Sequence, residues 1–211
     1  MTDQKKEALE FIIRNRQIRT VFQPIISLHD GGILGYEALS RITCEGEIRD
    51  PDTMHDETFK RGFTKTILKQ YGITPSNVIF EITERNVITD MSGFKAAINH
   101  YKSQNYKIAI DDAGAGYSGL NLISDIRPDY VKLDMKLIRD VDKGGLKYAL
   151  IKGMVEFSKV AEVFLVAEGI ETLEELGTLV DLGVQYGQGY FIQRPDPEVR
   201  EIMPEVLNAL R

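Results

Sequence analysis

Short, continuous apolar runs alternate with amphipathic stretches along the chain from residue 77 onward. The predicted strands span residues 77–83, 107–113, 130–135, 163–170 and 185–192. The predicted helices span residues 91–104, 117–123, 145–160, 172–182 and 196–210. Strands and helices that alternate in this way predict a parallel sheet whose strands are joined by right-handed helical crossovers.

The N-terminal part of the chain follows a different pattern. Residues 3–19 have the apolar spacing of an amphipathic helix, and residues 21–28 and 33–42 have the composition of two strands. The connection between these strands contains Gly31-Gly32 and is too short for a parallel crossover. We therefore expect an antiparallel hairpin at the start of the sheet.

Acidic residues stand at or just past the ends of successive apolar runs. They are Glu37, Glu81, Asp111, Asp112 and Glu168. A strand buried on both faces normally excludes a carboxylate, because an unpaired buried charge is costly or becomes neutral. The carboxyl ends of parallel strands meet at one end of a barrel, so these acids are predicted to converge there. Carboxylate clusters of this kind commonly hold divalent cations.

This placement favours a modified TIM-type (β/α)8 barrel over an open doubly wound sheet. The region between the second and third predicted strands contains one predicted helix, residues 56–71, and no strand-like run. The count is therefore seven strands where a closed barrel has eight. Either the chain has lost one strand and one helix, or the printed sequence omits a segment near residues 50–56. We favour the omission, because the loss of an interior strand would disrupt the closure of the barrel.

Composition places limits on this picture. The 211 residues suit one domain over residues 1–211, and the apolar fraction of 43 % is ordinary for a globular protein. No apolar run approaches the about 20 residues that span a bilayer. A net charge of −6 argues against nucleic-acid binding but permits an anionic ligand if metal ions bind. Cys44 is the single cysteine, which fits a reducing cytoplasm best.

Seven motifs follow one another in the order of a known family. They are FQPI (22–25), GYEALSR (35–41), FEITE (80–84), IDDAGAGYSGL (110–120), RPDYVKLD (127–134), VAEGIET (166–172) and GQGYFIQRP (187–195). This series resembles the EAL domains of bacterial cyclic di-GMP phosphodiesterases, named for the tripeptide found here as Glu37-Ala38-Leu39. A lone tripeptide would be weak support, but the ordered series is specific. The family fold is a modified barrel with an antiparallel first strand, which agrees with the predicted hairpin.

The resemblance implies a site for two divalent metal ions, Mg²⁺ or Mn²⁺. Glu37, Glu81 and Asp111 match the ligands of the first ion. Asp111 and Asp112 would share the second ion, which Glu168 would hold directly or through water. The alternative is that these acids pair with Lys or Arg inside the barrel. The family also has an asparagine ligand between the EAL and FEITE motifs, and no residue of this chain matches it.

The resemblance also implies roles for other residues. Lys132 would orient the hydrolytic water, and the catalytic set would be Lys132, Glu37, Asp111 and Glu168; a simple salt bridge from Lys132 to Asp112 is the alternative. Glu84 and Glu171 would support the metal ligands, unless they are solvated acids at helix starts. The substrate-binding set would be Gln23, Leu39, Arg41 and Gln188, and for Leu39 a purely structural role is equally open.

The activity implied by the resemblance is metal-dependent hydrolysis of cyclic di-GMP to linear pGpG. A degenerate EAL domain that acts as a cyclic di-GMP receptor or as a protein-interaction module is the alternative. The small residues of 113–118 suit a hinged loop, although Ala113 stands where the family commonly has a large aromatic residue. A homodimer, and fusion to sensory or cyclase domains in a longer chain, are further expectations from the family.

Overall fold

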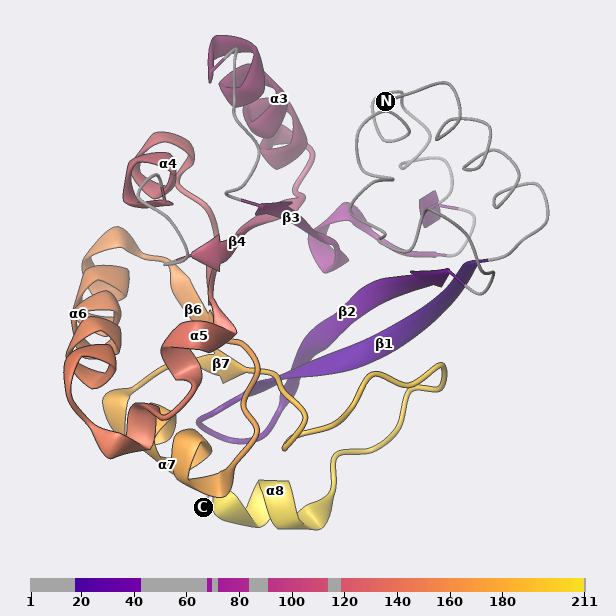
Figure 1. Ribbon diagram of the computed structural model, residues 1–211. Helices are drawn as coiled ribbons and strands as arrows, with labels where there is room; N and C mark the ends of the chain where they lie inside the picture. Colours follow the sequence, from indigo (N-terminus) through magenta and orange to yellow (C-terminus); the bar gives the residue numbers. More distant parts are fainter. Residues whose placement is uncertain (1–17, 43–67, 70–71, 84–90, 114–118, 211) are drawn as a thin grey trace.

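The computed structural model describes residues 18–42, 68–69, 72–83, 91–113 and 119–210 (Figure 1). Within these ranges seven strands form one curled sheet in the order β2-β1-β7-β6-β5-β4-β3. The strands are β1 (Ile18–Ser27), β2 (Ile33–Ile42), β3 (Ile79–Thr83), β4 (Lys107–Ala113), β5 (Tyr130–Leu133), β6 (Phe164–Ala167) and β7 (Tyr186–Gly187). The α-helices are α3 (Met91–Ser103), α4 (Gly119–Ile126), α5 (Met135–Ile138), α6 (Leu146–Ala161), α7 (Leu173–Leu182) and α8 (Pro204–Ala209). Two short 3-10 helices are η2 (Pro75–Asn77) and η3 (Val141–Lys143).

The first two strands form the predicted antiparallel hairpin, with Gln23 opposite Glu37. The helix predicted over residues 3–19 is wrong at its end, because β1 already begins at Ile18. Ile18 and Arg19 pair with residues of β2, and this cross-strand pairing overrides the helical spacing of the local sequence. The rest of that predicted helix lies outside the described residues.

The remaining strands form the predicted parallel part of the sheet. Each of β3 to β7 pairs with its sequence neighbour in parallel, whereas β1 pairs with β7 antiparallel, with Ile26 opposite Gly187. Helices α3, α4, α6 and α7 lie outside the curve of the sheet (Figure 1). The modified barrel with an antiparallel first strand is therefore confirmed.

The core lies between the strands and these outer helices. Ile110, Val131 and Leu165 of the strands are fully buried, as are Ile151 of α6 and Leu176 of α7. Burial of this kind is worth roughly 1.5–3 kcal/mol for each large aliphatic side chain. None of the helices in the described part of the chain is both long and apolar enough to cross a lipid bilayer.

Strands β2 and β3 form the two edges of the sheet, and within the described ranges no pairing joins them. The chain between these strands falls almost entirely outside the described residues. The same is true of the segment near residues 50–56 where we expect an omission, and of most of the helix predicted over 56–71. The single domain over residues 1–211 stays a prediction.

Boundaries near the end of the chain need correction, and one helix was not predicted. The last helix was expected over 196–210, but α8 begins at Pro204, because a proline inside a helix would break it and is favoured at its first position. Upstream, Asp196 exchanges main-chain hydrogen bonds with Phe22 instead of joining a helix. Strand β7 has two residues rather than the predicted eight, and α5 was not predicted.

Candidate active site

Lys132 lies at the centre of the acidic residues that the sequence singles out. It belongs to β5, where side chains alternate, so Lys132 faces the barrel interior while Val131 and Leu133 face the outer helices. The Nζ atom of Lys132 is 2.9 Å from Glu81 Oε1, 2.9 Å from Glu168 Oε1, 3.3 Å from Asp111 Oδ1 and 3.6 Å from Glu37 Oε1. The Lys132 side chain is only 2 % exposed. Acids from four separate segments therefore meet at one buried ammonium group.

One positive charge cannot balance this number of carboxylates. Burial raises the pKa of Glu81 to about 7 and that of Glu168 to about 8, although Lys132 pulls both in the other direction. Burial alone would lower the pKa of Lys132, but the surrounding carboxylates outweigh it and raise that pKa, so Lys132 stays charged. The alternative in which the acids pair with a basic residue is thus present in this structure, and the metal-binding role of the acids stays a prediction.

A β-bulge brings two consecutive aspartates to this site. In a regular strand Asp111 and Asp112 would point to opposite faces. Here the pairing of β4 with β5 shifts between Ile110 and Ala113, and Asp112 adopts a left-handed backbone with φ of 57°. Carboxylate oxygens of Asp111, Asp112 and Glu168 lie within 4.8 Å of one another. Oxygen ligands at this spacing fit a divalent cation.

Gln188 joins two of the acids. Its Nε2 donates to Glu37 Oε2 at 2.7 Å and to Glu168 Oε1 at 2.9 Å. Its buried Oε1 has no hydrogen-bond partner among the described residues. The main chain packs closely here, because a Cβ at Gly189 would lie 2.1 Å from the carbonyl oxygen of Ile170. The free amide oxygen adds another ligand of the type that hard cations prefer.

A cavity of about 250 Å³ lies beside the acids. Its lining residues are Asp112, Asp134, Met135, Lys136, Glu168, Gly169 and Gln188. The sequence prediction missed Asp134, Met135 and Lys136. Asp134 follows an apolar run just as the other acids do, so the signal was present. Its carboxylate accepts a hydrogen bond from the main-chain nitrogen of Lys136 at 2.7 Å and caps α5, a role that the pattern did not reveal.

The predicted substrate-binding residues other than Gln188 lie on the hairpin. Leu39 and Arg41 share the face of β2 that carries Glu37, because they follow it at intervals of two residues. Leu39 is half-buried, whereas Arg41 is exposed and donates to the carbonyl oxygen of Ser40 at 3.1 Å. Gln23 is buried and donates to the carbonyl oxygen of Gln193 at 3.0 Å. Their contacts with a substrate stay a prediction.

The two predicted supporting acids have different outcomes. Glu171 does not contact the Lys132 cluster in any described interaction; its carboxylate lies 2.7 Å from the guanidinium of Arg139. Glu84 lies outside the described residues, as does the loop over residues 114–118. The sequence prediction therefore placed Glu171 near the site but did not identify its partner.

A barrel in which acids from several strands cluster at one buried point is typical of metal-assisted hydrolases. The chain belongs to the EAL-domain family, whose model matches residues 47–195. The probable cyclic di-GMP phosphodiesterase PdeA of Escherichia coli K12 is 33 % identical over 131 residues, which are 62 % of this chain and 18 % of PdeA. Because the chain spans so little of that relative, additional sensory or cyclase domains in a longer natural chain stay a prediction.

Solved structures of EAL proteins have the same fold. A cyclic di-GMP-bound standalone versatile EAL protein from Vibrio cholerae O395 superposes with a TM-score of 0.77 at 27 % identity, covering 90 % of this chain and 97 % of that one. The manganese and cyclic di-GMP complex of BlrP1 from Klebsiella pneumoniae has a TM-score of 0.75 at 27 % identity, covering 85 % and 56 % of the two chains. The family predicted from the motifs is therefore confirmed.

Replacing Lys132 by Met should destabilise the metal-free protein most at high pH. The substitution removes the charge that offsets four carboxylates, and breaking a buried ion pair costs about 3–5 kcal/mol. The loss should be smaller at pH 5 than at pH 8, because Glu81 and Glu168, with pKa values of about 7 and about 8, are protonated at the lower pH. Urea unfolding with a chelator present measures this difference.

Lys159→Met serves as the control, since Lys159 pairs with Glu156 on the exposed surface of α6. Such a surface pair contributes less than about 1 kcal/mol. An equal loss of stability at both pH values in Lys132→Met would contradict the assigned charge balance.

Proposed function

We propose that this chain is a divalent-metal-dependent phosphodiesterase that hydrolyses cyclic di-GMP to linear pGpG. The observation that carries the proposal is the convergence of Glu37, Glu81, Asp111 and Glu168 on Lys132, with Asp112 beside them. Membership of the EAL-domain family and the cyclic di-GMP bound in related structures support this substrate.

The residues present suit two metal ions, Mg²⁺ or Mn²⁺. Glu37, Glu81 and Asp111 would hold one ion, and Asp111, Asp112 and Glu168 would hold the other. The clustered oxygens of the second set and the unpartnered amide oxygen of Gln188 fit hard cations. Bound ions of this type neutralise phosphate charge and lower the pKa of water. The manganese in the related BlrP1 structure supports the choice of metal.

The chain's own residues orient the reactants. The surrounding carboxylates raise the pKa of Lys132, so its ammonium would orient the attacking water as a hydrogen-bond donor rather than serve as a base. Gln188 holds Glu37 and Glu168 at fixed positions through its amide nitrogen. The water oxygen would form a bond to phosphorus in line with the leaving oxygen while the opposite P–O bond breaks, and one proton of the water would end on the leaving oxygen.

A receptor or protein-interaction module that does not hydrolyse cyclic di-GMP is the second candidate. In the described part of the sheet, Glu37 lies on edge strand β2 and Glu81 lies on edge strand β3, each strand with a single neighbour, which favours this candidate. The sequence also lacks a match to the family's asparagine ligand. A site with one ligand fewer would retain nucleotide binding more readily than turnover.

The purified chain should convert cyclic di-GMP to pGpG in the presence of Mn²⁺ or Mg²⁺, and a chelator should abolish the conversion. Glu168→Gln should lower kcat by about 100-fold or more, because Glu168 contacts both Lys132 and the cluster of aspartates. Glu156→Gln on the exposed face of α6 is the matched control and should leave turnover unchanged. Chromatography of the nucleotide products measures the result; tight binding without product would support the receptor instead.

Mn²⁺ should raise the thermal unfolding midpoint, and the increase should be larger at pH 8 than at pH 6. Protons and metal ions compete for Glu81 and Glu168, whose pKa values of about 7 and about 8 leave them largely protonated at pH 6. Asp111→Asn should remove most of the increase. Differential scanning fluorimetry at the two pH values measures it, and a shift that is the same at both would argue against metal binding by these acids.

We also propose that α6 supplies a homodimer interface. Leu146, Leu150, Phe157 and Val160 are exposed and follow one another at helical spacing on one face of α6, with Gly153 between them. Open space surrounds Gly153, so a second copy of α6 crossing there would place its Leu146 and Leu150 against Phe157 and Val160.

The double variant Leu150→Lys with Val160→Lys should be monomeric in analytical ultracentrifugation where the wild type is dimeric. A monomeric wild type at tens of micromolar would exclude this interface.

A further inference from the structure

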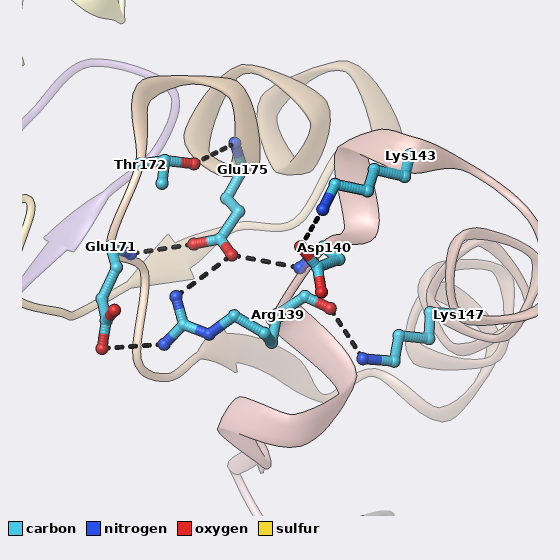
Figure 2. A network of polar contacts seen from close by, with 7 residues as sticks. All are labelled: Arg139, Asp140, Lys143, Lys147, Glu171, Thr172 and Glu175. Carbon is cyan, nitrogen blue, oxygen red and sulfur yellow. Dashed lines mark hydrogen bonds and ion pairs between the residues drawn. The ribbon is translucent and has the colours of Figure 1, made fainter.

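Glu175 is a buried carboxylate that the proposed chemistry does not use. It lies in the first turn of α7 and is 2 % exposed. Its Oε1 accepts hydrogen bonds from the main-chain nitrogen of Asp140 at 3.1 Å and from Nη1 of Arg139 at 3.3 Å (Figure 2). Its Oε2 accepts from the main-chain nitrogen of Glu171 at 2.9 Å. Three donors from two separate segments thus satisfy one buried charge.

Helix capping explains only part of this arrangement. Thr172 and Glu175 have the spacing of a capping box, and Thr172 Oγ1 accepts from the nitrogen of Glu175 at 3.1 Å as that motif requires. Glu175, however, also binds the segment between α5 and η3, which a cap does not need. Arg139 reaches back from that segment and pairs through its other nitrogen with Glu171 at 2.7 Å. We refer to Arg139, Asp140, Glu171 and Glu175 as the Glu175 clamp.

The two segments joined by the clamp are the continuations of two cavity walls. One wall, residues 134–136, precedes Arg139 by a few positions, and the other, residues 168–169, precedes Glu171. The walls also touch each other, because a Cβ at Gly169 would lie 2.6 Å from Cβ of Met135. Gly169 has φ of 70°, a conformation that side chains other than glycine rarely adopt. The walls therefore contact at the cavity, and the clamp fastens them farther along the chain.

We propose that Glu175 and Arg139 are positioning residues for Glu168. By joining the segment after β5 to the segment after β6, the clamp holds the Glu168 carboxylate against Asp111 and Asp112. Groups that orient metal-binding carboxylates without touching the metal commonly change its affinity 10- to 100-fold when they are removed. This role rests on the proposed function for its consequence in catalysis, but the joining of the two walls is a property of the fold itself.

Glu175→Gln tests the clamp. Glutamine has nearly the same shape as glutamate but carries no charge. Its amide NH₂ group takes the place of one carboxylate oxygen, so a main-chain N–H that now has an acceptor would face a donor. We expect the Kd for Mn²⁺, measured by calorimetry without substrate, to rise about tenfold. Hydrogen exchange of the main-chain amides should become faster in residues 134–140 and 168–172. For cyclic di-GMP, kcat should fall at least about tenfold, whereas KM should change less than about threefold. Glu174→Gln, an exposed neighbour in the same helical turn, is the matched control and should change none of these.

The proposal is overturned if Glu175→Gln loses thermal stability but has the same Mn²⁺ affinity and the same hydrogen exchange as Glu174→Gln. Glu175 would then act only as a helix-capping residue. If Glu175→Gln fails to fold, Arg139→Lys makes the same test, because lysine keeps the charge but lacks the two separate terminal nitrogens with which Arg139 reaches Glu171 and Glu175. If the wild type neither binds Mn²⁺ nor hydrolyses cyclic di-GMP, the proposed function fails. The clamp is tested separately: unchanged hydrogen exchange of both cavity walls in Glu175→Gln overturns it.

Discussion

The need to balance buried negative charge shapes the interior of this barrel. Several carboxylates reach the same point from different strands, and one ammonium group, that of Lys132, offsets part of their charge. In the low dielectric of the interior the rest of the charge must be lost by protonation or matched by another cation. The raised pKa values of Glu81 and Glu168 express the first outcome, and metal binding would provide the second.

Much of this could be predicted from the sequence because the signals are local and periodic. Apolar runs such as KIAI and FLVA in β4 and β6 mark strands buried on both faces, and the acids that follow them mark the carboxyl ends. The hairpin was predictable for the same reason, since the connection around Gly31-Gly32 permits only an antiparallel return.

The errors arose where long-range contacts decide the structure. Pairing with β2 makes a strand of Ile18 and Arg19, although the residues before them have helical spacing. Asp134 is a local exception: it follows the same pattern as the site acids, yet its carboxylate caps α5 through the main-chain nitrogen of Lys136, two residues later. The partners of Glu175 are 35 and 36 positions away from it, so no local pattern indicates that the two cavity walls are fastened together.

The irregular pairing at the end of β4 has a consequence for how such sites arise. Regular pairing would direct Asp111 inward and Asp112 toward the outer helices, so the same two residues would supply one interior oxygen donor group instead of two. The left-handed backbone of a single residue thus adds a donor without adding a strand. In this architecture the number of carboxylates that face the interior depends on one backbone torsion, the φ of Asp112, as much as on the number of acidic side chains.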